Sequence, residues 1–380
     1  MFVPPPKKTS IHICKICNEQ KLISASLSIC NDCILSFPSK AEKYIYTAHK
    51  KARERFNLPV NPPSGDKKIC SLCYHNCGFG LNDMSFCGLR YTKNGKYISK
   101  TDENNAILDY YFDPLPCNCC AAWFCPAGTG LGYPDYAYKE GKEYGYYNLS
   151  IFFYGCSFNC LFCQNKSHKS ISIGSRISVS QLTSVFSKNP KIACICFFGG
   201  SPEPQFDFAI NLSEKILQVA EKEKRIARIC WEWNGFGTRS KVRTASELSF
   251  KSGGNIKFDL KAWSPSIHKA LTGVDNKRVL DNFKFVGETY FEKRSELAML
   301  NASTLLVPGY IDEKEVEKIA SFIASINENI PYSLLGFYPH FEMRDLPLTS
   351  LKLAEACFEI ASDYLTNVNI GNKHILAIYE

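Results

Sequence analysis

Short apolar runs alternate with amphipathic stretches through the second half of the chain. Six of these runs, rich in β-branched and aromatic residues, predict buried strands over 149–154, 192–198, 226–233, 255–260, 301–307 and 332–338. Apolar positions at helical spacing predict helices over 179–188, 208–222, 240–250, 276–286, 312–326 and 349–365. Strands that alternate with helices predict a parallel sheet with right-handed crossovers. The predicted fold class is therefore α/β, and about 230 residues suit a partial (β/α)6 TIM-like barrel.

The first 148 residues do not follow this alternation. Residues 40–56 are amphipathic and predict a helix, and several prolines and a glycine in 57–68 mark a linker after it. Small cysteine-rich metal-binding modules are expected in this part, ahead of the barrel. The predicted organisation is a zinc-ribbon-like module in 1–36, the helix and Pro-rich linker in 37–68, a cysteine-rich auxiliary region in 69–148 and the barrel in 149–380.

Composition restricts the compartment. The sequence has no run of about 18 apolar residues, the length that a transmembrane helix needs, so no membrane partner is expected. The N-terminal residues Met-Phe-Val-Pro-Pro-Pro-Lys-Lys lack the apolar core of a signal peptide. We therefore expect a cytoplasmic protein, and there clustered cysteines indicate metal sites rather than disulfides.

Charge is concentrated in the N-terminal part of the chain. Residues 1–68 contain 12 Lys and Arg against 5 Asp and Glu, so +7 of the net charge of +8 lies there. A basic segment of this kind favours a polyanion or an acidic protein surface as partner, and a solvated, soluble module is the alternative.

Two cysteine groups in the N-terminal half have the spacing of metal ligands. The first has the pattern C-x2-C-x12-C-x2-C, which suits a tetrahedral zinc site, with rubredoxin-like iron as the alternative; it consists of Cys14, Cys17, Cys30 and Cys33. The second suits either zinc or a second iron–sulfur cluster, and the sequence does not choose between them; it consists of Cys70, Cys73, Cys77 and Cys87.

A third cysteine group and four scattered cysteines carry weaker signals. The third group lies in a turn-rich segment that we expect to be an irregular lid, partly held by metal, close to the loop that contains Cys156, Cys160 and Cys163; it consists of Cys117, Cys119, Cys120 and Cys125. The scattered cysteines lie in apolar segments and are predicted to be small buried hydrophobic residues; they are Cys194, Cys196, Cys230 and Cys357.

The fourth group carries the most specific chemistry. Cys156, Cys160 and Cys163 have the spacing C-x3-C-x2-C and follow the first predicted barrel strand, where Gly155 permits a sharp turn. A [4Fe–4S] cluster normally takes four cysteine thiolates. Three ligands in one loop therefore leave one iron open for a small molecule, at the strand end where α/β barrels place their chemistry.

This loop resembles the signature of radical S-adenosylmethionine (SAM) enzymes, and further strand-end motifs extend the resemblance over about residues 69–375. Phe197-Phe-Gly-Gly-Ser-Pro-Glu-Pro204 is similar to the GGEP-type motif, although a serine stands where an acidic residue is usual. Trp231-Glu-Trp-Asn-Gly235 is similar to the DTNG segment of pyruvate formate-lyase activating enzymes. Phe258-Asp-Leu-Lys261 matches a D-x-K pair, and Gly336-Phe-Tyr-Pro-His340 matches an element that ends in histidine.

The resemblance implies the cofactors and their ligands. Cys156, Cys160 and Cys163 would hold a [4Fe–4S] cluster whose open iron binds SAM. A monovalent cation would lie near the acidic residue of the DTNG-like segment. The residues implied in cofactor binding are Gly199, Gly200, Ser201, Glu203, Glu232, Asn234, Asp259, Lys261 and His340.

The resemblance also implies the activity. We expect a radical SAM oxidoreductase, similar to glycyl-radical activating enzymes, that forms a 5′-deoxyadenosyl radical and abstracts a hydrogen atom from a protein or peptide. An electron donor of the flavodoxin or ferredoxin type would serve it. One alternative is modification of RNA or another macromolecule docked by the basic N-terminal module. Another is a non-catalytic zinc-ribbon binding protein.

Overall fold

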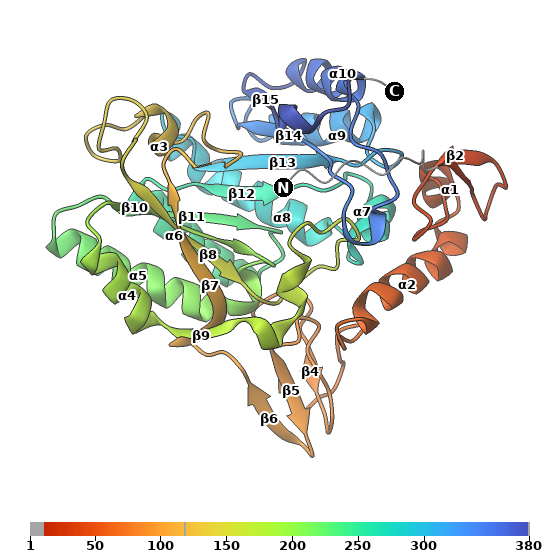
Figure 1. The fold of residues 1–380 in the computed structure, drawn as a ribbon, viewed down its shortest axis with the longest axis horizontal. Helices are drawn as coiled ribbons and strands as arrows, with labels where there is room; N and C mark the ends of the chain where they lie inside the picture. The colour runs from red at the N-terminus through yellow and green to blue at the C-terminus, as the bar shows by residue number, and fades with distance from the viewer. Residues whose placement is uncertain (1–10, 118, 379–380) are drawn as a thin grey trace.

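A single large sheet organises the protein. The structure is a computed structural model that describes residues 11–117 and 119–378. Within these residues, nine strands form the sheet in the order β15-β14-β13-β12-β11-β10-β8-β7-β9, and the pairs from β8 to β15 are all parallel. The sheet is curved, with helices on its outer face (Figure 1). Because the edge strands β9 and β15 do not pair with each other, it forms an open, partial barrel.

The predicted α/β class and its strand and helix order are confirmed. The six predicted strands are β8 (Tyr147–Phe153), β10 (Ile192–Gly199), β11 (Arg228–Trp233), β12 (Ile256–Asp259), β13 (Leu300–Leu306) and β14 (Tyr332–Gly336). The six predicted helices are α4 (Val179–Lys188), α5 (Phe206–Lys222), α6 (Arg239–Ser252), α8 (Lys277–Val286), α9 (Glu313–Ala324) and α10 (Leu351–Ser362). Strand residues alternate between the helix layer and the barrel interior, because successive side chains point to opposite faces.

The structure adds elements that the sequence pattern does not predict. β7 (Asn105–Pro114) and β9 (Ser175–Ser178) extend the sheet antiparallel beyond β8, and β15 (Val368–Gly371) extends the other edge. α7 (Pro265–Thr272) begins with a proline and ends at Gly273 in the left-handed region. None of the described helices is long and apolar enough to cross a bilayer.

The N-terminal segment packs on the side of the barrel. It contains the hairpin β1 (Ile11–Ile13) and β2 (Gln20–Leu22), then α1 (Asn31–Ser36) and α2 (Pro38–Glu54), which lie beside α7 (Figure 1). The Tyr310 hydroxyl accepts a hydrogen bond from the Ser24 backbone at 3.0 Å, and Asp345 accepts one from Ala25 at 2.7 Å. The first ten residues of the predicted 1–36 module lie outside the described residues.

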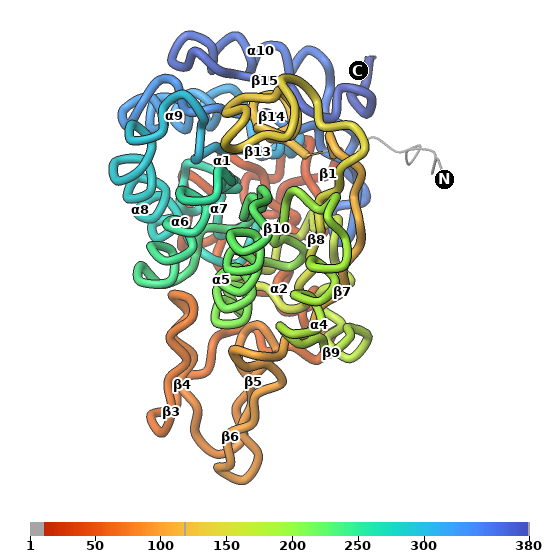
Figure 2. Tube along the Cα trace, turned by 90° about the vertical axis from the view of Figure 1, so that its left-hand side faces the viewer, coloured from red at the N-terminus to blue at the C-terminus, as the bar shows by residue number. Residues whose placement is uncertain are grey.

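The region 69–148 has two separate parts. The first contains the short strands β3 (Lys68–Ile69) and β4 (Gly78–Phe79) and the hairpin β5 (Arg90–Lys93) and β6 (Lys96–Ser99), which projects away from the barrel (Figure 2). The second, residues 115–146 with α3 (Pro126–Thr129), lies where β8 and β11 begin. The Leu115 amide donates a hydrogen bond to the carbonyl of Tyr146, directly before β8. The Tyr138 hydroxyl donates one to the carbonyl of Ile226, two residues before β11.

The position of residues 115–146 corrects one expectation. The predicted lid close to the three-cysteine loop lies instead at the opposite, amino-terminal end of the parallel strands. The physical reason is that β7 runs antiparallel to β8, so the chain leaving β7 emerges where β8 begins. We call residues 115–146 the end segment.

Candidate functional site

The three-cysteine loop begins two residues after β8, at the carboxyl end of the sheet. Gly155 has a φ of +82°, and a Cβ there would lie 2.9 Å from Leu89 Cδ1 and 3.1 Å from the Cys87 carbonyl oxygen. Only glycine suits this close approach in the left-handed region. The loop itself is fixed by backbone hydrogen bonds from Asn159 and Leu161 to the last turn of α7.

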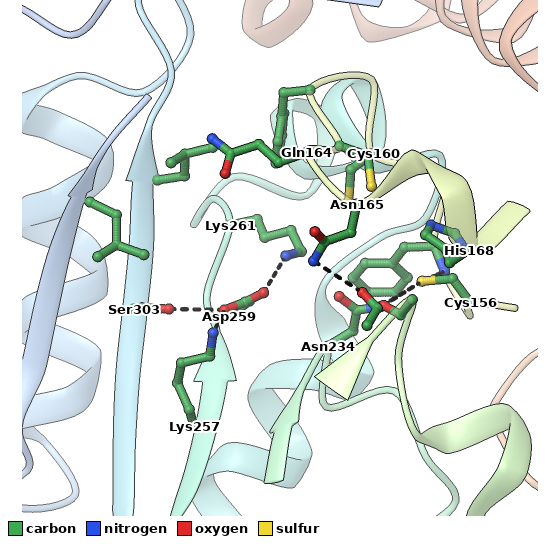
Figure 3. A pocket seen from close by; sticks show the side chains of 17 residues that line it. Cys156, Cys160, Gln164, Asn165, His168, Asn234, Lys257, Asp259, Lys261 and Ser303 are labelled. Carbon is green, nitrogen blue, oxygen red and sulfur yellow. Dashed lines mark hydrogen bonds and ion pairs between the residues drawn. The ribbon is translucent and has the colours of Figure 1, made fainter. Parts of the chain in front are cut away.

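The three thiols meet a pocket of about 180 Å³ inside the mouth of the barrel (Figure 3). Besides these cysteines, polar side chains from several strand ends line it: Gln164, Asn165, His168, Asn234, Lys257, Asp259, Lys261 and Ser303. No fourth cysteine occurs among the described residues that line the pocket. The ends of three strands, β10, β11 and β12, thus bring five of the nine predicted cofactor-binding residues to the pocket: Gly199, Gly200, Asn234, Asp259 and Lys261. The other four, Ser201, Glu203, Glu232 and His340, do not line it.

Asp259 is the charged centre of the pocket. Its carboxylate lies 2.7 Å from Lys261 Nζ and 3.1 Å from Lys257 Nζ, and it accepts a hydrogen bond of 2.9 Å from the Ser303 hydroxyl (Figure 3). Burial opposes ionisation of this carboxyl, but the two ammonium groups outweigh burial and hold its pKa well below the usual range. The pocket therefore contains a fixed carboxylate between two cations.

The two glycines after β10 bring that strand end against the three-cysteine loop. A Cβ at Gly200 would lie 2.1 Å from the Gly155 carbonyl oxygen, and Gly199 has a φ of +110°. The Gly200 carbonyl accepts a hydrogen bond of 3.2 Å from the Cys156 thiol. Glycine is required here because a larger side chain would separate the two loops.

Ser201 and Glu203 lie buried behind the pocket wall. The Ser201 hydroxyl donates to the Glu203 carboxylate, which also accepts a 3.0 Å hydrogen bond from the Phe236 backbone. Glu203 is fully buried, and burial raises its pKa to about 7. These two residues brace the turn after β11 rather than face the space where a ligand would bind.

Asn234 and His340 hold the cysteine loop. The Asn234 amide donates to the Cys156 sulfur at 3.3 Å and to the Ser157 hydroxyl at 3.2 Å. His340 Nδ1 lies 2.8 Å from the Cys163 carbonyl oxygen, so this nitrogen carries the proton and donates. Asn234 thus contacts one thiol directly, and His340 holds the backbone of a second cysteine.

Glu232 faces away from this pocket. It lies 3.1 Å from Lys257 Nζ, and one of its oxygens accepts a hydrogen bond of 3.1 Å from the Cys119 thiol of the end segment. The Lys257 ammonium thus bridges Glu232 and Asp259. A lysine ammonium occupies the position between two carboxylates where the resemblance implied a monovalent cation.

Sequence reasoning missed a buried polar chain beneath the loop. Lys169 Nζ donates to the Asn159 side chain at 2.7 Å, and Asn159 Nδ2 lies 2.8 Å from His49 Nδ1 on α2. Lys169 is 2% exposed, so its charge is held beside the three thiols. No sequence signal links His49 to the loop, because 110 residues separate it from Asn159.

The other cysteine groups differ in compactness. The four sulfurs of Cys14, Cys17, Cys30 and Cys33 all lie within 4.8 Å of one another, a spacing that suits a single ion. No three sulfurs of the group Cys70, Cys73, Cys77 and Cys87 lie that close in the described chain. Next to that second group, His75 Nε2 lies 2.6 Å from the Ser157 carbonyl oxygen of the three-cysteine loop.

The donor set of the pocket fits the implied cofactors. The sulfurs of Cys156, Cys160 and Cys163 do not all lie within 4.8 Å of one another. This wider spacing suits three corners of a cubane cluster better than a single ion. His168 Nδ1 is buried at the pocket wall without a hydrogen-bond partner among the described residues. Ammonium and carboxylate side chains suit the charged amino and carboxylate groups of SAM.

Comparisons with known proteins agree with this geometry. The sequence model of the radical SAM superfamily matches residues 150–323. A protein of Methanocaldococcus jannaschii named as a glycyl-radical enzyme activating enzyme is 28% identical over 223 residues, which are 58% of this chain and 79% of that protein. The isethionate sulfite-lyase activating enzyme of Desulfovibrio desulfuricans is 33% identical over 165 residues, 42% of this chain and 48% of that enzyme.

The structure of this chain is also similar to solved structures. A domain of the pyruvate-formate lyase-activating enzyme from Bacteroides vulgatus matches at 21% identity with a TM-score of 0.37, over 47% of this chain and 98% of that domain.

Proposed function

We propose that the protein is an enzyme that reductively cleaves SAM and abstracts a hydrogen atom from a protein or peptide, and the match of the radical SAM superfamily model to residues 150–323 supports this. The observation that carries the proposal is three thiols on one loop, facing a pocket with a carboxylate and two ammonium groups. When bound, a [4Fe–4S] cluster and SAM supply the electron transfer and the 5′-deoxyadenosyl radical, and the protein supplies orientation.

The pocket residues have separable proposed roles. Cys156, Cys160 and Cys163 hold the cluster, and the contacts of Asn234 and His340 fix two of these ligands. Lys261 provides a charge-assisted donor for a carboxylate on SAM. The carbonyl oxygens of the Gly199–Gly200 turn provide acceptors for its ammonium group. These residues bind and orient the cofactor, and the closed wall behind Glu203 excludes water from that side.

A protein or peptide substrate is favoured by the relatives, whose names describe activation of other enzymes. A flavodoxin- or ferredoxin-type protein is the proposed electron donor. The second candidate, a radical SAM enzyme that modifies RNA, is favoured by the exposed lysines on α2, Lys40, Lys43, Lys50 and Lys51. Binding of RNA that weakens steeply with salt would support this candidate.

We also propose that the compact group of Cys14, Cys17, Cys30 and Cys33 binds zinc. Four thiolates are a common ligand set of structural zinc sites. The hairpin and short helix that carry them are too small for a core of their own, so the metal would stabilise their fold.

The proposed function is tested by anaerobic reconstitution of the full chain with iron and sulfide, followed by SAM and dithionite. We expect formation of 5′-deoxyadenosine, measured by chromatography and mass spectrometry. A cluster that is reduced by dithionite, as shown by its absorbance, but gives no 5′-deoxyadenosine would contradict the proposal.

A second prediction concerns Lys257. Because its ammonium bridges Glu232 and Asp259, SAM cleavage by the unaltered protein should be insensitive to replacement of K⁺ by a bulky organic cation. In Lys257→Met the Glu232 carboxylate loses its ammonium partner and Asp259 keeps only Lys261, so the rate should fall at least about tenfold without small cations, equivalent to ~1.4 kcal/mol. Addition of K⁺ or Na⁺ should restore it.

The matched control is Lys241→Met, which removes a 2.6 Å ion pair with Asp207 on the outer helices, where both side chains are about one-third exposed or more. This variant should remain insensitive to cations. Equal cation dependence of the unaltered protein and of Lys257→Met would show that the ammonium does not replace a cation.

A further inference from the structure

A second cavity lies inside the barrel, at the end opposite the pocket lined by Cys156, Cys160 and Cys163, which we call the SAM pocket after its proposed ligand. Its volume is about 140 Å³, and the end segment closes it. Six cysteines line it, three from the end segment and three from barrel strands: Cys117, Cys119, Cys125, Cys194, Cys196 and Cys230. Thiols of two distant parts of the sequence therefore converge on one interior space.

The strand register explains how the three barrel cysteines meet. Cys194 and Cys196 are two residues apart on β10, so both side chains point into the barrel, while Ile195 and Phe197 point to the helix layer. Cys196 is the direct register partner of Cys230 on β11. These cysteines thus form one surface of sulfur on two neighbouring strands.

The end segment supplies the opposing thiols. Cys117 and Cys125 lie in the cavity wall, and Cys125 directly precedes α3. The sulfurs of Cys119 and Cys120 and an oxygen of Glu232 lie within 4.8 Å of one another. Apolar side chains would be enough to close this end of the barrel by packing. The end segment instead places metal-ligating groups there.

Cationic groups point at this sulfur-rich space. The Arg228 guanidinium donates two hydrogen bonds to the Cys194 sulfur, at 3.2 and 3.1 Å, and Lys257 pairs with Glu232 in the wall. Arg228 is only 1% exposed. Buried N–H donors aimed at sulfur favour an anionic thiolate, and metal ions bind cysteine in that form.

We propose that this cavity binds an iron–sulfur cluster through thiolates from both the end segment and the barrel strands. Its six thiols exceed the four ligands that a single zinc ion takes. They also surround open space, whereas the sulfurs of the N-terminal group have closed to within 4.8 Å. In a cluster the thiolates bind several iron atoms, so their sulfurs lie farther apart than around a single ion. The iron and sulfide atoms of the cluster also fill the space between these thiolates, so the site needs an open volume.

This second centre goes beyond the proposed function and does not depend on it. The Lys257–Glu232 pair separates the two sites, since Lys257 lines the SAM pocket and Glu232 lines the thiol cavity. The centre would therefore persist in a variant that lacks the three cysteines of the SAM loop, even if that loop bound no cluster.

The test compares three full-length proteins reconstituted anaerobically with ferrous iron and sulfide. The first variant is Cys194→Ser, Cys196→Ser and Cys230→Ser together, and the second is Cys117→Ser, Cys119→Ser and Cys125→Ser together. Each leaves only three lining thiols, so each should lose about two to four iron atoms and as many sulfides per chain, the content of one cluster. Iron, sulfide and zinc are measured by elemental analysis, and cluster type by Mössbauer spectroscopy.

The control is Cys357→Ser, a fully buried cysteine on α10 that lies outside every cysteine group and should keep all the iron. The variant in the end segment leaves the sheet unaltered, so it decides the question if the strand variant does not fold, as judged by circular dichroism. Iron content equal to that of Cys357→Ser in the folded variants, or zinc in place of iron at these thiols, would overturn the proposal.

Discussion

Replacement of Cys156, Cys160 and Cys163 by alanine should abolish formation of 5′-deoxyadenosine. The pocket that these thiols line has no other described cysteine, so no neighbour can substitute for them. The expected fall in rate is at least about 1,000-fold, or ~4 kcal/mol of lost stabilisation of the transition state. The measurement is the yield of 5′-deoxyadenosine per chain after anaerobic reconstitution.

The same variant should keep one zinc ion per chain. The compact N-terminal group lies on a separate hairpin and helix that dock on the barrel through Tyr310 and Asp345 rather than through the three thiols. Cys357→Ala is the matched control, since it removes a buried thiol from α10 and should retain both zinc and activity. Undiminished product from the triple variant would exclude the three-cysteine loop as the catalytic centre.

The sequence predicts the barrel well because its strands are buried on both faces. The runs at 192–198 and 301–307 differ by only a residue or so from β10 and β13, since both end at turns that contain glycine. β7 escapes prediction because half of its length faces solvent, with Tyr111 50% and Phe112 43% exposed. Exposed aromatic residues remove the contrast on which a periodicity argument depends.

The SAM pocket is partly predictable for a different reason. Asp259 ends β12, Lys261 and Asn234 follow strands of the same parallel sheet, and carboxyl ends of parallel strands converge. Lys257 is missed because it lies within its strand, two residues before Asp259. The sequence gives no sign that Glu232 on the neighbouring strand lies close to it. The register pair between Lys257 and Glu232 is a tertiary fact.

The thiol cavity was hidden for a related reason. Cys194, Cys196 and Cys230 occur in apolar runs, so composition alone favours small buried residues. A period of two was the available signal, because Cys194 and Cys196 alternate with Ile195 and Phe197. Even so, the sequence could not show that a segment whose last lining cysteine, Cys125, lies 69 residues before Cys194 would place further thiols opposite them.

Arg228→Met should destabilise the barrel by about 3–5 kcal/mol, the usual cost of removing one partner of a buried ion pair. Arg228 and Glu143 have side-chain exposures of 1% and 0%, and the guanidinium forms a two-bonded pair with the carboxylate. It also donates to the Tyr136 carbonyl at 2.6 Å. Without it, Glu143 would be a buried charge with only the Tyr138 backbone donor, at 2.7 Å, left to it.

This ion pair joins the end segment to β11, so its loss should also loosen the end segment. The measurement is the midpoint of urea unfolding, followed by circular dichroism, together with amide exchange of residues 115–146. The matched control is Arg176→Met, which removes a 3.2 Å pair with Asp102 in which both partners are about half exposed. Exposed pairs contribute only about 0–1 kcal/mol, so this control should unfold close to the unaltered protein.

A double variant separates the ion pair from the packing of its side chains. Replacing both Arg228 and Glu143 with Met removes the two charges together, and such replacements are often neutral or stabilising for buried pairs. We therefore expect the double variant to recover most of the stability lost in Arg228→Met. If Arg228→Met unfolds at the same urea concentration as Arg176→Met, the buried pair does not hold the end segment on the barrel, and another contact must do so.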